Sequence, residues 1–123
     1  MRQWILAAGL ALCAVAAQAD GLENKWRLEV SGNAKTAGQI VVQVSPEKGE
    51  PIRATAQIPA GTAENDVARN VSTALQMAAS GHYSVEVDDG EDVLVKKKDG
   101  ERDFAVTVVE NTVQGVTVNV DTE

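Results

Sequence analysis

The amino-acid sequence predicts an α+β domain built on an antiparallel sheet. Apolar residues alternate with polar residues in seven short runs, which is the pattern of half-buried strands. One segment, after the third run, instead repeats its apolar residues at helical spacing. Gly, Pro, Asn and Asp residues separate the runs, so we expect an antiparallel meander in the order βββ-α-ββββ, with the helix packed on one face.

The seven predicted strands are defined by their alternating apolar residues. These are Trp26, Leu28 and Val30; Ile40, Val42 and Val44; Ile52, Ala54, Ala56 and Ile58; Tyr83, Val85 and Val87; Val93 and Val95; Phe104, Val106 and Val108; and Val116, Val118 and Val120. One helix covers only about four strands at a spacing of roughly 4.8 Å. The remaining apolar faces therefore need a second layer, supplied either by sheet curvature or by another subunit.

The predicted helix follows Thr62, a good N-cap residue, and ends before Gly81, the expected C′ residue. Glu64 and Asp66 fall in the first turn, where the helix dipole favours negative charge. The apolar face consists of Val67, Val71, Ala74, Leu75 and Ala78.

Asp99-Gly100 is a two-residue type I′ turn signal, so we expect a hairpin around it. This turn would set Val95 opposite Phe104 on the core face. It would also set Lys96 opposite Asp103 on the outer face, a favourable cross-strand pair. The hydrophobic pattern and the turn agree on this register.

The turn Asp88-Asp89-Gly90 is compatible with two registers. A two-residue loop would put Val85 and Val93 on opposite faces, whereas a three-residue loop with a left-handed Gly90 sets them opposite each other. We predict the three-residue loop because one face of the hairpin must be buried. Its cost is a like-charge pair between Glu86 and Asp92.

A similar argument predicts a turn at Glu47-Lys48-Gly49, which would set Val44 opposite Ile52.

The N-terminal segment has the three parts of a secretory signal peptide. Arg2 is a positive n-region, Trp4–Ala17 is an apolar h-region, and Ala17-Gln18-Ala19 is a small-x-small cleavage site. The sequence therefore predicts a signal peptide over residues 1–19 and a single domain over residues 20–123, located in the periplasm or secreted.

Two other interpretations of this segment are disfavoured. A membrane anchor needs roughly 20 apolar residues, which is more than this stretch provides. Lipidation of Cys13 needs a small residue before the cysteine, and Leu12 is not small. Cleavage removes Cys13, the only cysteine, so we expect no disulfide, thiol nucleophile or thiolate ligand in the remaining chain.

Charge restricts the class of partner. The formal net charge of the chain is −7, and loss of Arg2 makes the remaining domain one unit more acidic. Nucleic acids and anionic membranes should be repelled, because such ligands are bound mainly through Lys and Arg. A basic partner or a cation should be attracted.

No catalytic constellation is visible. His82 is the only histidine, and no serine lies in a Gly-x-Ser-x-Gly turn. The three aromatic residues of the predicted domain, Trp26, Tyr83 and Phe104, fall on the core face, which argues against a sugar-binding cleft. We therefore predict a non-enzymatic protein without a cofactor, and rank a small hydrolase last among the alternatives.

One acidic cluster is a candidate cation site. Glu86, Asp88, Asp89 and Asp92 supply the hard oxygen ligands that calcium prefers, beside a glycine that allows a bent loop. The spacing is not that of an EF-hand. A solvated acidic turn that keeps the hairpin soluble and prevents edge pairing explains the same residues.

Four apolar residues fall out of phase with the core stripes of their strands. In the predicted register Leu94 lies opposite Ala105, so the two would form a small apolar spot on the outer face. A protein partner or a second subunit would cover it, although scattered exposed apolar residues are also normal. The four residues are Val41, Leu94, Ala105 and Val109.

The segment from Gly38 to Leu75 resembles part of a known module. It contains the strand sequence Gln39–Val44, then Ile58-Pro59-Ala60-Gly61-Thr62-Ala63, then Val67-Ala68 and Ala74-Leu75. This order is similar to the strand-strand-helix half of the ββαββ modules in phage tail sheath and related tail proteins. The resemblance implies the local fold over about a third of the chain.

These observations predict a small exported module that binds or assembles with a macromolecule. The alternative is a calcium-responsive module that uses the acidic hairpin, residues 86–92.

Overall fold

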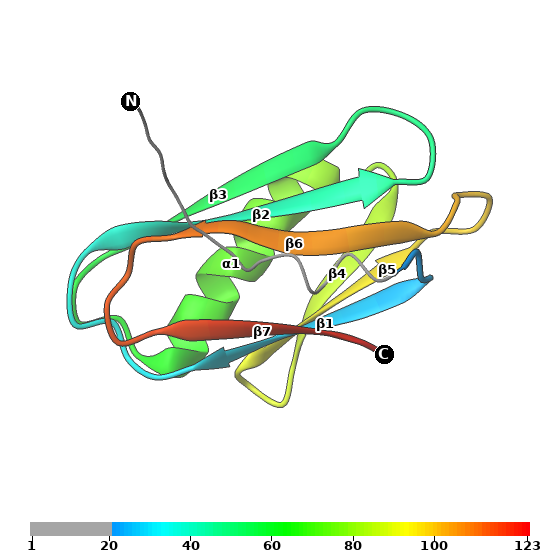
Figure 1. Ribbon diagram of the computed structural model, residues 1–123. Coiled ribbons are helices and arrows are strands. Elements are labelled where there is room, and N and C mark those ends of the chain that lie inside the picture. The colour runs from blue at the N-terminus through cyan, green and yellow to red at the C-terminus, as the bar shows by residue number, and fades with distance from the viewer. Residues whose placement is uncertain (1–20) are drawn as a thin grey trace, which may run out of the picture.

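The structure is a computed structural model that describes residues 21–123. Within this range the α+β class, the antiparallel pairing and the βββ-α-ββββ order are confirmed (Figure 1). The elements are β1 (Lys25–Ser31), β2 (Gly38–Pro46), β3 (Ile52–Ile58), α1 (Glu64–Ala79), β4 (Tyr83–Asp88), β5 (Asp92–Lys97), β6 (Phe104–Asn111) and β7 (Thr117–Thr122).

The strands divide between two antiparallel sheets, with the orders β4-β5-β1-β7 and β3-β2-β6. On one side β6 lies beside β7 without a hydrogen-bonded ladder, and on the other α1 contacts both β3 and β4. The two sheets thus curve around one core, with the helix behind them in Figure 1. Curvature supplies the second layer that the sequence requires.

Phe104, the first residue of β6, connects the two sheets. Its ring is fully buried, with its centroid 4.7 Å from that of Tyr83. Its backbone N–H and C=O exchange hydrogen bonds of 2.9 Å with Glu23, just before β1. The indole Nε1 of Trp26 on β1 also donates to the Phe104 carbonyl, at 2.8 Å. The three aromatic residues lie in the core, as predicted.

The hairpin of β2 and β3 has the register expected from a turn at Glu47-Lys48-Gly49, with Val44 opposite Ile52. Gly49 has a φ of 114°, which an L side chain rarely adopts. Strand alternation and turn chemistry agree here, and the local sequence is sufficient to fix the pairing.

The β4–β5 hairpin forms, but our predicted register is wrong by two residues. Val93 pairs with Val87 instead of Val85, and the ladder extends to Asp88 opposite Asp92. The three residues between these aspartates form the loop, and the first two have φ values of 53° and 82°. The prediction that the apolar residues of this hairpin share one face is correct, because Val85 and Val93 still lie on the same side of the sheet.

The predicted hairpin at Asp99-Gly100 is wrong. The tight turn forms, with a φ of 88° at the glycine, but it carries the chain from one sheet to the other. Val95 pairs with Trp26 on β1 and with Val85 on β4, so both edges of β5 are occupied. Phe104 pairs instead with Pro46 on β2. Long-range pairing with β1 has overridden the local turn signal.

The N-terminus of α1 is capped by a distant loop, so the predicted N-cap is also wrong. The Glu64 N–H donates to Asn33 Oδ1 at 2.9 Å, and Glu64 Oε2 accepts from the Gly32 N–H at 2.8 Å. The Thr62 hydroxyl donates to the Pro59 carbonyl at 2.7 Å instead of to the helix. Asn33 therefore supplies the capping oxygen that sequence proximity assigned to Thr62.

Gly32, which follows β1, lies against Gly115 in the loop between β6 and β7, and Gly61 is a matched control without such a neighbour. Both have left-handed φ values, 93° and 87°, but a Cβ at Gly32 would lie 2.0 Å from the Gly115 carbonyl oxygen, whereas one at Gly61 meets nothing within 4 Å. We expect Gly61→Ala to cost about 1–2 kcal/mol, the penalty of the left-handed conformation. Gly32→Ala should lower the free energy of unfolding further, measured by urea denaturation. Equal losses would show that the loops do not meet.

Candidate functional site

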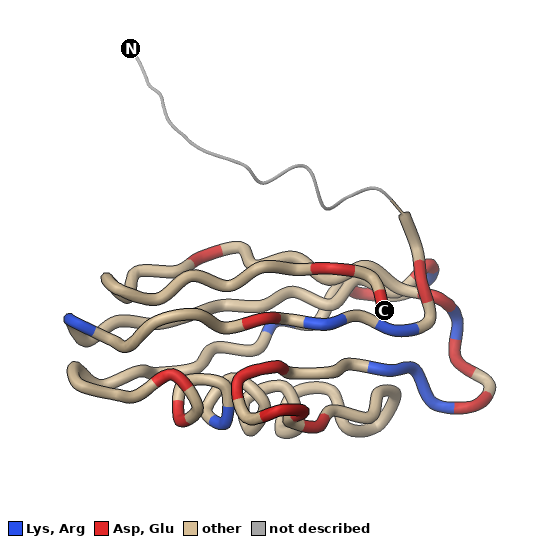
Figure 2. Tube along the Cα trace, turned by 90° about the horizontal axis from the view of Figure 1, so that it is seen from below, with Lys and Arg blue, Asp and Glu red and all other residues tan. Residues whose placement is uncertain are grey.

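The outer face of the β4-β5-β1-β7 sheet carries an ordered pattern of charge, and we call it the charged face. Its side chains lie in three cross-strand rows. The first row is Ser84, Lys96 and Lys25; the second is Glu86, Leu94, Arg27 and Asp121; the third is Asp88, Asp92, Glu29 and Asn119. Along the strands the face therefore changes from two lysines in the first row to three carboxylates in the third. In Figure 2 most of the blue segments lie near the C-terminus, where red segments also lie.

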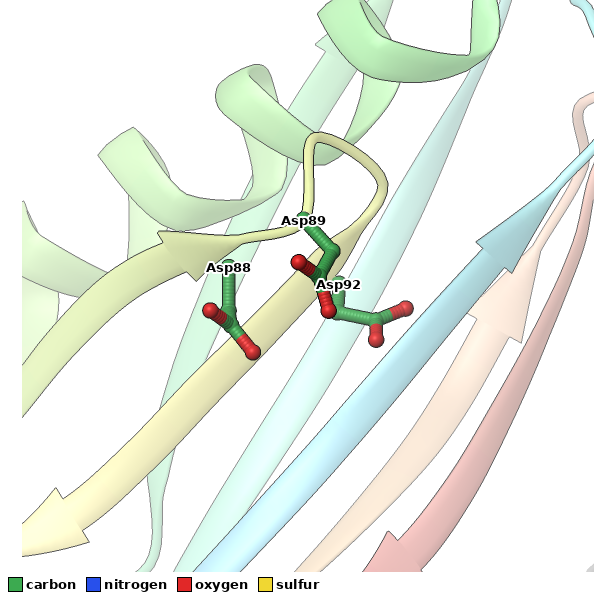
Figure 3. Close-up of side chains that lie close together, drawn as sticks. All are labelled: Asp88, Asp89 and Asp92. Carbon is green, nitrogen blue, oxygen red and sulfur yellow. The ribbon is translucent and has the colours of Figure 1, made fainter.

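The acidic end contains three of the four predicted cation ligands. Asp88, Asp89 and Asp92 each place a carboxylate oxygen within 4.8 Å of the other two (Figure 3). Glu86 lies one row away, opposite Leu94, and does not join them. The predicted like-charge pair of Glu86 with Asp92 is accordingly replaced by Asp88 opposite Asp92.

Arg27 is the residue that sequence reasoning missed. Its Nη1 donates to a carboxylate oxygen of Asp92 and, at 3.3 Å, to Asp88. Its Nε and Nη2 donate to the two carboxylate oxygens of Glu123, at 2.7 and 2.8 Å. Alternation along β1 places Arg27 on the outer face, but only the β1–β5 pairing brings it to the acidic hairpin.

These contacts shift the pKa values of Arg27 and Glu123. The hydrogen bond that Arg27 donates to Glu123 raises the pKa of Arg27 most, and the hydrogen bond to Asp92 raises it further. The Arg27 hydrogen bond lowers the pKa of Glu123 below its usual range. Asp92 is only 7% exposed, and its Oδ1 has no hydrogen-bond partner among the described residues. Arg27 thus forms ion pairs with both aspartates of the like-charge pair, but its single charge does not balance them, and one buried carboxylate oxygen stays unsatisfied.

At the basic end, Lys25 and Lys96 lie directly opposite each other, and within residues 21–123 neither has a carboxylate within 4.0 Å. Lys25 has an acidic neighbour in Glu123, whose N–H donates to the Lys25 carbonyl at 3.2 Å and whose carboxylate also interacts electrostatically with Lys25. Lys97 donates to the Glu101 carbonyl at 2.8 Å and also forms an ion pair with Asp103 at 4.0 Å, whereas Lys98 donates to the Ser80 carbonyl at 2.6 Å.

Two shallow hollows lie at the basic end. The larger, about 260 Å³, is lined by Asn24, Lys25, Lys96, Lys97, Lys98 and Asp99. The smaller, about 50 Å³, is lined by Lys25, Ser84, Glu86, Leu94 and Lys96. The second hollow places the partly exposed Leu94 beside both lysines of the first row.

The predicted apolar spot is not formed. Leu94 lies on the charged face, whereas Val41, Ala105 and Val109 lie in the other sheet, where Ala105 pairs with Ser45. The crossover after β5 is the reason, because the expected pairing of Leu94 with Ala105 depended on a β5–β6 hairpin. Val109 is 40% exposed, whereas Val41 is buried.

His82 lies at the junction of α1 and β4, with a largely exposed side chain. Its Nδ1 is 2.9 Å from the Glu101 carboxylate.

Comparison of the sequence with protein-family models and with curated proteins finds no match. The resemblance to tail sheath modules therefore stays a prediction. In the described part of the chain, no helix is long and apolar enough to cross a membrane. The predicted signal peptide, residues 1–19, lies outside the described residues.

The Arg27–Glu123 pair predicts a pH-dependent stability difference. The pKa of Glu123 is lowered in the folded state, so its contribution is present above the unfolded-state pKa, about 4.3, and is lost as the pH falls through the folded-state value. We expect Glu123→Gln to lower the melting temperature at pH 7, with the difference from wild type closing in acid. Glu110→Gln, which removes another exposed carboxylate, is the control. A difference that stays constant down to pH 2 would contradict the pairing.

Proposed function

We propose that this chain is an exported, non-enzymatic module that binds a macromolecular partner through the charged face. The observation that carries the proposal is the Lys25–Lys96 row, in which neither lysine has an ion pair within 4.0 Å among the described residues, at one end of a face whose other end is acidic. Like charges directly opposite on neighbouring strands are destabilising. A partner with carboxylates above the lysines would remove that cost.

The centre of the face supports the same function. Leu94 is partly exposed between Glu86 and Arg27 and lines the smaller hollow. An apolar residue surrounded by polar ones matches the usual composition of a protein interface, with an apolar centre and a polar rim. Of the four interface residues predicted from the sequence, we therefore keep Leu94.

Site-specific photocrosslinking in the exporting cell tests the proposal. A photoreactive phenylalanine at position 94 should give covalent adducts, whereas one at Met77, which is 83% exposed on α1, should not. Adducts in equal yield from both positions, or from neither, would contradict binding through the charged face. Melting curves of the two variants establish that both are folded.

Export is tested separately. The intact mass of protein recovered from the periplasmic fraction should correspond to a chain beginning at Asp20, because cleavage is expected after Ala19. A full-length product retained in the membrane fraction would show that residues 1–19 act as an anchor instead.

Calcium binding by the acidic hairpin is the second candidate function. It is favoured by the proximity of the Asp88, Asp89 and Asp92 carboxylates and by the unsatisfied Oδ1 of Asp92. We rank it second because Arg27 already forms ion pairs with two of the three carboxylates.

A thermal melt separates the two functions. A cation at 100 times its dissociation constant adds about 2.7 kcal/mol to stability. We expect millimolar calcium to do no more than sodium at equal ionic strength. A saturable shift that is abolished by Asp89→Asn, which leaves the Arg27 contacts in place, would make calcium binding the first candidate.

A further inference from the structure

We infer that the partner of the charged face is a second copy of this chain, in a symmetric dimer whose two-fold axis runs across the strands. This inference rests on the proposed function and specifies its partner. The basis is the order of the rows, with Lys25 and Lys96 at one end, Leu94 and Arg27 in the middle, and Asp92 and Glu29 at the other end.

Symmetry turns this order into a prediction of geometry. When two identical faces pack against each other, the two-fold axis lies in the plane between them. An axis parallel to the strands would set the lysine row against the partner's lysine row. An axis across the strands reverses their direction and sets each lysine row against the acidic row of the other copy. Only the second arrangement sets opposite charges against each other in the two outer rows; in the middle row, which lies on the axis, Glu86, Arg27 and Asp121 face their own equivalents.

The two central strands of the sheet, β5 and β1, would make the main contacts. With the axis through the middle row, Leu94 faces its own equivalent and forms the apolar centre. Lys25 then lies over Glu29 of the other copy, and the reverse contact occurs on the other side of the axis. Arg27 brings no unpaired charge to this centre, because Asp88, Asp92 and Glu123 already surround it.

The area of the charged face determines how tightly the dimer is expected to bind. Four strands about 4.8 Å apart and three rows about 7 Å apart cover roughly 19 by 20 Å. Stable interfaces bury about 800 Å² on each partner, so a patch of roughly 380 Å² falls below that range, at the size of weak and transient contacts. We therefore expect a weak dimer, visible at high protein concentration and weakened by salt.

A charge exchange between positions 25 and 29 tests the inference. Lys25→Glu and Glu29→Lys each create two repulsive contacts in a homodimer, so each variant alone should dimerise at least about tenfold more weakly than wild type. In a mixture of the two variants, the carboxylate introduced at position 25 of one chain faces the ammonium introduced at position 29 of the other. The native Lys25–Glu29 contact remains on the second side of the axis, so the mixture should form a heterodimer. Lys48→Glu, in the β2–β3 turn, makes the same charge change elsewhere and should dimerise like wild type.

Sedimentation equilibrium up to about millimolar protein, at low and high salt, measures these effects, and circular dichroism establishes that each variant is folded. A wild type that stays monomeric, or a mixture that does not associate, would overturn the inference. If the wild type is monomeric but position 94 crosslinks to a different protein, the self-association inference fails and the proposed function stands. If it is monomeric and position 94 crosslinks to nothing, both fail.

Discussion

The arrangement of the whole domain depends on the position of Phe104. Its ring is buried against Tyr83, and its backbone bonds to Glu23 while its carbonyl also accepts from the Trp26 indole. These contacts attach the first residue of β6 to the strand that begins the other sheet. They hold the two sheets together at one end. Elsewhere along this side the sheets have no such connection, since no hydrogen-bonded ladder joins β6 to the neighbouring β7. A single residue thus adds a polar connection to two sheets whose facing sides otherwise share an apolar core.

The charged face follows from this arrangement. Because the chain crosses to the other sheet after β5, the second edge of β5 is free to pair with β1. That pairing brings Arg27 beside the acidic hairpin and sets Lys25 opposite Lys96. The same strand pair therefore places a positive charge beside one like-charge pair and creates another. The asymmetry between the two ends of the face is a direct result of the topology.

Local sequence signals were sufficient for part of the fold. Alternation identified the seven strands, and the helical spacing after Thr62 identified α1. The register of the β2–β3 hairpin also followed from its turn. Each of these features depends on residues close together in the chain, where one strand period or one turn type determines the result.

The remaining features depend on contacts between distant residues. Asp99-Gly100 has the chemistry of a hairpin turn, but β1 competes for the same edge of β5 with an equally apolar stripe, and the sequence does not rank the two. The cap of α1 comes from Asn33, about thirty residues before it. The acidic residues of the candidate site were found from their spacing, whereas Arg27 was missed because only strand order places it beside them.

The lack of a ladder between β6 and β7 has a consequence for local unfolding. β7 is hydrogen-bonded to β1 alone, and its inward-facing residues Val118 and Val120 are only partly buried. A strand with one bonded edge and little buried apolar area belongs to the least protected units in amide hydrogen exchange. The Arg27–Glu123 ion pair lies directly after the end of this strand. Opening of β7 would release the guanidinium from Glu123, so fraying of the C-terminal strand and the charge of the outer face are linked in one equilibrium.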